Sequence, residues 1–226
     1  SGTFRTAYPA GGNTNRNMQV AGNFTRTAGT FNTAAGAAGI TTMTFNGTAG
    51  KQTITGTLTF NNVTINNTSS PNDTVMLGAG TDLTVAGDWT MTAGKFDAVT
   101  NKRLVTFASA TVAQSITGST LLNNLTINNT FGDVTLASGT LTVDSVLTLT
   151  NGILSLGNNS LVLNDTNFTA IQGGTFGTTR MIRTSGSSSA AGVTKTIPNT
   201  VTDFTYPVGT GSIYTPVRLI ISNAGT

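Results

Sequence analysis

The eight aspartates of this chain are its only acidic side chains, so they are the first candidates for chemistry. They accompany 11 Lys and Arg, and the sequence has no Glu, His or Cys. General acid–base catalysis needs a histidine or a pair of carboxylates with separated pKa values. Most of the aspartates instead stand beside Gly, Asn or Thr, where Asp is normally a turn residue. We therefore predict that the chain is not an enzyme, and a polysaccharide-active enzyme is one of the alternatives with less support.

Metal binding would have to rely on oxygen ligands, because His, Cys and Glu are missing. Such a ligand set suits Ca²⁺. The Asp-rich nonapeptide of calcium-binding β-rolls is absent, and the segment PNDT at 71–74 is better interpreted as a turn. The sequence predicts no metal site and no cofactor.

The basic charge of the chain is small and scattered. The net charge is +3, only 8% of residues are charged, and the one adjacent pair of cations is Lys102 and Arg103. A nucleic-acid-binding surface needs a basic stripe that follows the phosphate backbone. No apolar run approaches the length of a membrane-spanning helix. We expect neither nucleic-acid binding nor direct membrane insertion.

Threonine is abundant and often occurs as Thr-x-Thr pairs that flank apolar residues. The clearest pairs are Thr57/Thr59, Thr90/Thr92, Thr140/Thr142 and Thr148/Thr150. Their hydroxyls should face solvent, and flat ranks of outward Thr occur in some ice-binding β-helices. The pairs fall at different phases of the strand repeat, however, and any exposed strand favours Thr. Ice binding is therefore an alternative with less support.

Aromatic side chains offer a second kind of binding site, because sugar rings stack on them. Tyr206 and Tyr214 lie in the proline-containing C-terminal part and are our candidate ligand-contacting aromatics. Trp89 aligns with Phe24 of an earlier sequence repeat, which predicts a core position. A carbohydrate-binding module with a lateral groove is the main alternative function.

The segments that carry many of these residues occur twice in the sequence. NNVTINNT at 61–68 returns as NNLTINNT at 123–130, within a longer match of 43–68 to 105–130. VAGNFTRTAGTF at 20–31 likewise matches VAGDWTMTAGKF at 85–96, and a weaker copy begins at residue 143. Such self-similarity is typical of repeat architectures.

A finer period of about 20 residues predicts the fold. Apolar-x-apolar triplets recur at Val63/Ile65, Leu83/Val85, Val105/Phe107, Leu125/Ile127 and Leu147/Leu149. Three short strands per 20 residues, separated by Gly or Asn, describe one coil of a right-handed parallel β-helix. The repeat of about 62 residues would then be three coils. An antiparallel sandwich or barrel is the competing fold, which the recurrence of equivalent positions disfavours.

The asparagines of the two octapeptides are predicted to form corners of the coils. Asn tolerates the left-handed backbone conformation that corners use, and its amides can stack in ladders. The structural Asn corners are Asn61, Asn62, Asn66, Asn67, Asn123, Asn124, Asn128 and Asn129.

The period divides the chain into three parts. Residues 1–17 lack apolar alternation and are predicted to be an N-terminal cap or linker. Residues 18–178 carry the β-helix repeats. Residues 179–226 contain Pro198, Pro207 and Pro216 and are predicted to be an irregular β cap or the start of a next module.

The repeats resemble those of very large adhesin-like proteins on the surface of gliding-type Gram-negative bacteria that use type IX secretion. The resemblance rests on VAGNFTRTAGTF, on the octapeptide repeats, on 136–164, and on FTYPVGTGSIYTPVRLIIS at 204–222. It covers most of residues 18–222 through a repeat style, and no active-site motif contributes to it. It implies an extracellular, cell-surface location and a filament or stalk role in adhesion or motility.

The resemblance also implies partners and a modification. Partners would be other segments of a longer parent chain, like subunits, or surface glycans. Proteins of this bacterial group carry O-glycans at Asp-Thr/Ser-aliphatic triplets, which match DTV at 73–75 and DSV at 144–146. Thr74 and Ser145 are therefore candidate O-glycosylation sites. We expect Thr74 in an insertion loop and Ser145 within a strand.

Overall fold

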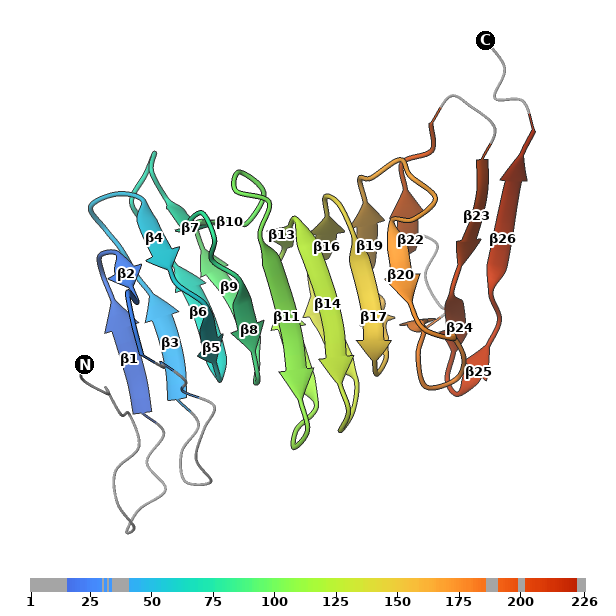
Figure 1. Ribbon diagram of the computed structural model, residues 1–226, viewed down its shortest axis with the longest axis horizontal. Coiled ribbons are helices and arrows are strands. Elements are labelled where there is room, and N and C mark those ends of the chain that lie inside the picture. The colour runs from blue at the N-terminus through green and yellow to red at the C-terminus, as the bar shows by residue number, and fades with distance from the viewer. Residues whose placement is uncertain are drawn as a thin grey trace.

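The computed structural model describes residues 16–29, 31, 33, 41–185, 191–198 and 202–222. In these ranges every regular element is a β-strand. No helix within them is long and apolar enough to cross a membrane. The strands stack in parallel as a β-solenoid of about 8 turns, with about 22 residues per turn (Figure 1). The predicted β-helix is confirmed.

The inner turns place one strand on each of three faces. Face A is a ten-stranded sheet of β1 (Arg16–Val20), β3 (Thr41–Phe45), β6 (Asn62–Asn66), β9 (Trp89–Ala93), β12 (Gln114–Thr117), β15 (Val134–Ser138), β18 (Leu154–Gly157), β21 (Ile182–Thr184), β24 (Val208–Thr210) and β25 (Ile213–Tyr214). Face C is a six-stranded sheet of β5 (Leu58–Phe60), β8 (Leu83–Val85), β11 (Leu104–Ser109), β14 (Asn124–Asn129), β17 (Leu147–Asn151) and β20 (Ile171–Gly173). These two faces run along most of the rod.

Face B lies between them in chain order and consists of two four-stranded sheets. The first contains β2 (Phe24–Thr25), β4 (Gln52–Thr55), β7 (Thr74–Leu77) and β10 (Lys95–Asp97). The second contains β13 (Thr120–Leu122), β16 (Thr140–Val143), β19 (Ser160–Leu163) and β22 (Gly192–Lys195). The remaining strands, β23 (Thr202–Tyr206) and β26 (Val217–Ile221), pair antiparallel with each other.

The alternation of apolar and polar residues explains why the strands close around a core. In β6, Val63 and Ile65 are buried, while the neighbouring Asn62, Thr64 and Asn66 are only partly buried. On face C, Leu58, Leu83, Val105, Leu125, Leu147 and Ile171 are successive register partners and stack as one buried column. Each apolar column continues from coil to coil, so the core runs along the rod.

The two octapeptides lie on different faces, which corrects the expectation that the long repeat spans three coils. The first copy forms β6 on face A, and the second forms β14 on face C. The matched segments 43–68 and 105–130 begin at β3 and β11, eight strands apart. With three strands per turn, eight strands make two and two-thirds turns. The sequence repeat is therefore offset by one face.

The other sequence matches show the same offset. Phe24 lies in β2 on face B, and its aligned partner Trp89 lies in β9 on face A. Leu147, which aligns with Trp89 in the third copy, lies in β17 on face C. A unit of one strand and one corner fits any of the three faces, so the repeat has no need to equal a whole number of turns.

The stacked coils extend beyond the expected boundary between residues 178 and 179. β21 and β24 continue face A in parallel register, and β22 continues face B. The antiparallel strand β25 then ends face A. The antiparallel pair of β23 and β26 lies at this end of the rod (Figure 1). At the other end, β1 already belongs to face A although it begins at Arg16.

Candidate functional site

Each octapeptide supplies one buried asparagine that ties three coils together. In the first copy, Asn67 is fully buried, and its Nδ2 donates to Gln52 Oε1 at 3.2 Å and to Gly50 O at 2.9 Å. Gln52 Nε2 donates in turn to the carbonyls of Val20 at 2.6 Å and Gly22 at 2.8 Å, one coil earlier. The two amides thus satisfy backbone groups where the chain turns from face A to face B.

The second copy repeats this network at another corner. Asn129 Nδ2 donates to Gln114 Oε1 at 3.1 Å, and Gln114 Nε2 donates to the carbonyls of Val85 at 2.9 Å and Gly87 at 2.7 Å. Val85 and Gly87 are the aligned counterparts of Val20 and Gly22. The same hydrogen bonds therefore form where the chain turns from face C to face A. This is the structural reason for the repeated octapeptide.

The other asparagines of the octapeptides lie at corners or strand ends. Asn62 Oδ1 accepts from the Asp88 N–H at 2.8 Å, and Asn124 Oδ1 accepts from the Val146 N–H at 3.3 Å. Asn128 Oδ1 accepts from Asn151 Nδ2 at 2.7 Å, which is one rung of an amide ladder. Asn61 and Asn123 precede β6 and β14, and Asn66 ends β6.

The expected left-handed asparagines are not observed in the described ranges. Lys102 is the one non-glycine residue there with a positive φ, at 54°. Glycine supplies this conformation instead, for example at Gly94 and Gly152, with φ of 82° and 85°. A Cβ on either would meet a carbonyl oxygen, that of Asn67 at 2.5 Å or that of Asn129 at 2.4 Å. The two glycines are aligned in the sequence repeats, so they belong to the same corner unit.

Several aspartates cap neighbouring coils. Asp88 Oδ1 accepts from the Ser115 N–H at 2.7 Å, and Asp82 Oδ1 accepts from the Leu104 N–H at 3.0 Å. Burial alone would raise the pKa of Asp97, but hydrogen bonds from Thr100 and Val99 bring it below the ordinary value. The described residues contain no group of three or more His, Cys, Asp or Glu that could hold a metal ion.

The two candidate O-glycosylation sites lie in the opposite kinds of local structure from those expected. Thr74 is the first residue of β7, whereas the expectation placed it in a loop. Ser145 lies in the corner between β16 and β17, whereas the expectation placed it in a strand. Its N–H donates to the Asn123 carbonyl at 2.9 Å, and both side chains are partly exposed. The insertion after β6 ends one residue earlier than the expectation assumed.

The aromatic candidates lie at the C-terminal end. Tyr206 packs edge-to-face on Phe204 with ring centroids 4.7 Å apart, and burial raises its pKa. It lines an apolar hollow of about 430 Å³ together with Val193, Val208 and Val217. Tyr214 ends the short strand β25 and is partly buried. Trp89 is fully buried, and its Nε1 donates to Thr120 Oγ1 at 3.1 Å, which confirms its core position.

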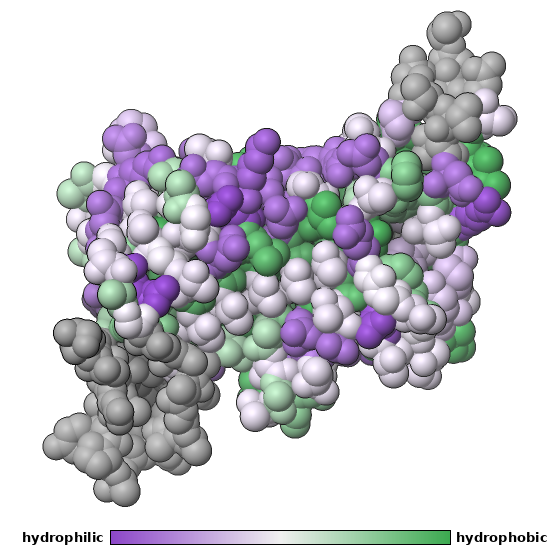
Figure 2. All heavy atoms as spheres, in the orientation of Figure 1, coloured by the Kyte–Doolittle hydropathy of each residue, from purple (hydrophilic) through white to green (hydrophobic). Residues whose placement is uncertain are grey.

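Outward threonines form one continuous file on face C. Thr59, Thr84, Thr106, Thr126 and Thr148 are successive register partners, and Gln172 follows them. The Thr-x-Thr pairs nevertheless fall on separate faces, as expected: Thr90 lies on face A, Thr140 on face B and Thr148 on face C. The centre of the face turned to the viewer is mostly pale in Figure 2, between hydrophilic and hydrophobic. The Thr-x-Thr pairs therefore do not form one flat surface with two parallel rows of threonine.

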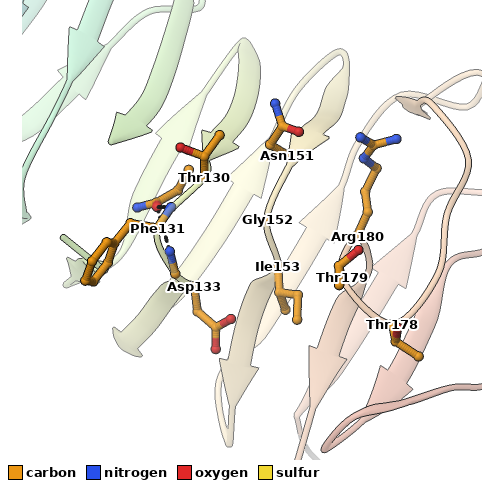
Figure 3. A pocket seen from close by; sticks show the side chains of 11 residues that line it. Thr130, Phe131, Asp133, Asn151, Gly152, Ile153, Thr178, Thr179 and Arg180 are labelled. Carbon is orange, nitrogen blue, oxygen red and sulfur yellow. Dashed lines mark hydrogen bonds between the residues drawn. The ribbon is translucent and has the colours of Figure 1, made fainter. Parts of the chain in front are cut away.

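Two adjoining hollows near the C-terminal end of faces C and A share Arg180. The first, of about 370 Å³, is formed by three successive corners: 129–133, 151–153 and 178–180 (Figure 3). The second, of about 650 Å³, lies over β17 and β20 and is lined by Thr148, Thr150, 171–174 and Phe176. We call the two together the Arg180 groove. Their volumes lie in the range of ligand-binding clefts.

The groove has both apolar and polar side chains, and the polar ones are amides, hydroxyls, Asp133 and Arg180. In Figure 3 the Arg180 guanidinium and the Asn151 amide project in the same direction, while the Phe131 ring points away from them. Asp133 is neutralised by an ion pair with Arg183, whose Nη2 also donates to Ser155 Oγ at 3.3 Å. Among the described residues Arg180 forms no ion pair. Sequence reasoning missed this residue because nothing in its local sequence signals the groove.

Comparison with protein-family models, with curated proteins and with solved structures found no match to this chain. Its class therefore rests on its own geometry, which is that of a β-solenoid repeat protein.

Proposed function

We propose that this chain is a stiff, non-enzymatic segment of a bacterial cell-surface protein, and that it acts as a stalk or filament in adhesion or motility. The observation that carries the proposal is the continuity of the solenoid: face A runs through ten hydrogen-bonded strands from β1 to β25. About eight turns at about 4.8 Å each give a rod of roughly 38 Å. A rod with one continuous face along its length separates what is attached to its two ends.

The C-terminal end supports a role within a larger assembly. Ile213, Val217 and Ile220 expose 62%, 54% and 58% of their surface. In Figure 2 this end of the rod carries hydrophobic patches beside hydrophilic ones. Exposed apolar side chains at the end of a repeat array can be covered when a further repeat or subunit stacks there. A further segment of the parent chain or a like subunit is the partner that this proposal implies.

The location outside the cell and the glycans at Thr74 and Ser145 belong to the same proposal. They are supported by the resemblance of the repeats and by the partial exposure of both side chains. If the mass of the native protein equals that of the bare polypeptide, the proposed glycosylation is wrong, but the proposed stalk role is unaffected.

The intact size and location of the native protein test the stalk role. An antibody raised against this chain is applied to whole cells, shed surface material and lysates. We expect a surface-exposed band many times larger than the 23.1 kDa of the chain itself. A band near that mass, confined to the cell interior, would contradict the proposal.

A further inference from the structure

The charge of Arg180 is not compensated by a neighbouring acid. Within the described ranges the ion pairs join Lys95 to Asp73, Arg183 to Asp133, and Arg218 to Asp203. Arg180 Nη1 makes one long hydrogen bond, to the Thr175 carbonyl at 3.3 Å. Its Nε is buried and has no hydrogen-bond partner. A ligand cannot reach the buried Nε, so the capacity to bind an anion lies with the Nη groups, of which Nη1 is held by that one long hydrogen bond.

Glycine makes room for this guanidinium. A Cβ on Gly174 would lie 2.4 Å from Arg180 Nη1, so any side chain there would displace the cation. A Cβ on the adjacent Gly173 would meet the Phe176 ring at 2.9 Å. The two glycines therefore keep the floor of the groove flat beside the cation and the aromatic ring.

The rest of the groove offers neutral hydrogen-bonding groups. Thr148 and Gln172 are register partners on face C, and both line the hollow next to Arg180. Thr178 and Thr179 are exposed on the other side of the cation. Asn151 uses its Nδ2 to bond Asn128, and its carbonyl oxygen adds an acceptor on the wall of the groove.

We propose that the Arg180 groove binds a polysaccharide that contains uronic acid. Arg180 pairs with the sugar carboxylate, and the side chains of Thr148, Gln172 and Asn151 hydrogen-bond to ring hydroxyls. One cation among hydroxyls and amides matches a ligand with few charges and many hydroxyls. A phosphodiester polymer would need several cations along its path. This inference adds a ligand to the rod and does not depend on the size of the parent protein.

Titration of the full chain with a short oligosaccharide that carries a single uronic acid, called the oligouronate below, tests the proposal, with a neutral oligosaccharide of equal length as the comparison. We expect the oligouronate to bind more tightly and its affinity to fall as salt is added. Arg180→Ala should weaken binding by about ten- to hundred-fold, the range of one charge-assisted hydrogen bond. Arg26→Ala is the matched control, because Arg26 also has a buried, unpaired Nε but lies at the opposite end of the rod.

A second variant keeps the test valid if Arg180→Ala loses its fold. Gln172 is exposed in β20, so Gln172→Glu should fold normally and place a negative charge beside the bound carboxylate. We expect this variant to lose oligouronate binding through like-charge repulsion. Unchanged affinity in both variants, equal affinity for the neutral sugar, or no binding at millimolar oligouronate would each overturn the proposal. None of these outcomes would alter the expected size of the native protein.

Discussion

At the scale of single residues, the solenoid depends on buried amides at its corners. Gln52 and Asn67 form the same network as Gln114 and Asn129, although the two networks lie at different corners. Buried polar groups stabilise a fold only when each is satisfied, and here the amides satisfy one another and the backbone of neighbouring coils. The outward amides one residue earlier, at Asn66 and Asn128, lie in a more exposed setting.

The paired asparagines give a direct test of this difference. Asn67→Ala and Asn129→Ala each leave buried partners unsatisfied, so each should lower the free energy of unfolding by about 1–3 kcal/mol. Asn66→Ala, at the neighbouring outward position, should change it by less than about 0.5 kcal/mol. Urea denaturation of the three variants measures the effect. Equal losses at Asn66 and Asn67 would show that the buried network has no special role.

At the scale of elements, the strands followed from the sequence because inward residues recur from coil to coil. Leu83/Val85 and Val105/Phe107 are such pairs and stack in β8 and β11 on face C, whereas Val63/Ile65 lies in β6 on face A. The face of each strand did not follow from the sequence, because corners differ in length: the connection between β6 and β7 is longer than that between β3 and β4 or between β5 and β6. The Arg180 groove was also out of reach, since it joins corners at 129–133, 151–153 and 178–180.

The last coil contains a buried charge that predicts a dependence of stability on pH. Lys195 ends β22 with 7% of its surface exposed, and its Nζ lies 4.9 Å from the centre of the Phe204 ring. Burial lowers the pKa of this ammonium, and the charge of Asp165 partly offsets the effect. Between the lowered pKa and the ordinary value of 10.5, the unfolded chain binds more protons than the folded chain. The free energy of unfolding therefore rises with pH in that window.

Replacement of this lysine isolates its contribution. Lys195→Met removes the titrating group and retains an unbranched apolar side chain. We expect urea midpoints measured upward from pH 8 to rise less steeply for this variant than for the parent chain. Tyrosine titration is common to both proteins, so it cancels in the comparison. Identical slopes would mean that Lys195 does not carry a lowered pKa.

At the scale of the whole molecule, the length of the sequence repeat is not a whole number of solenoid turns. Eight strands separate equivalent residues, such as Trp89 in β9 and Leu147 in β17. Each copy is thereby moved by one face, and three copies would bring a motif back to its starting face. A longer rod built in this way would display each surface motif along a spiral. Nearest-neighbour stacking makes such lengthening possible without a new core.

Duplication of one repeat within the chain tests this account most directly. A second copy of residues 43–104 is inserted between Leu104 and Val105, where the aligned repeats make both junctions match. The insert should add two and two-thirds turns, so the longest dimension measured by small-angle X-ray scattering should increase by about 13 Å at an unchanged cross-section. An unfolded chain, or a folded one that widens without lengthening, would contradict the claim that strand-and-corner units are interchangeable among the three faces of a continuous rod.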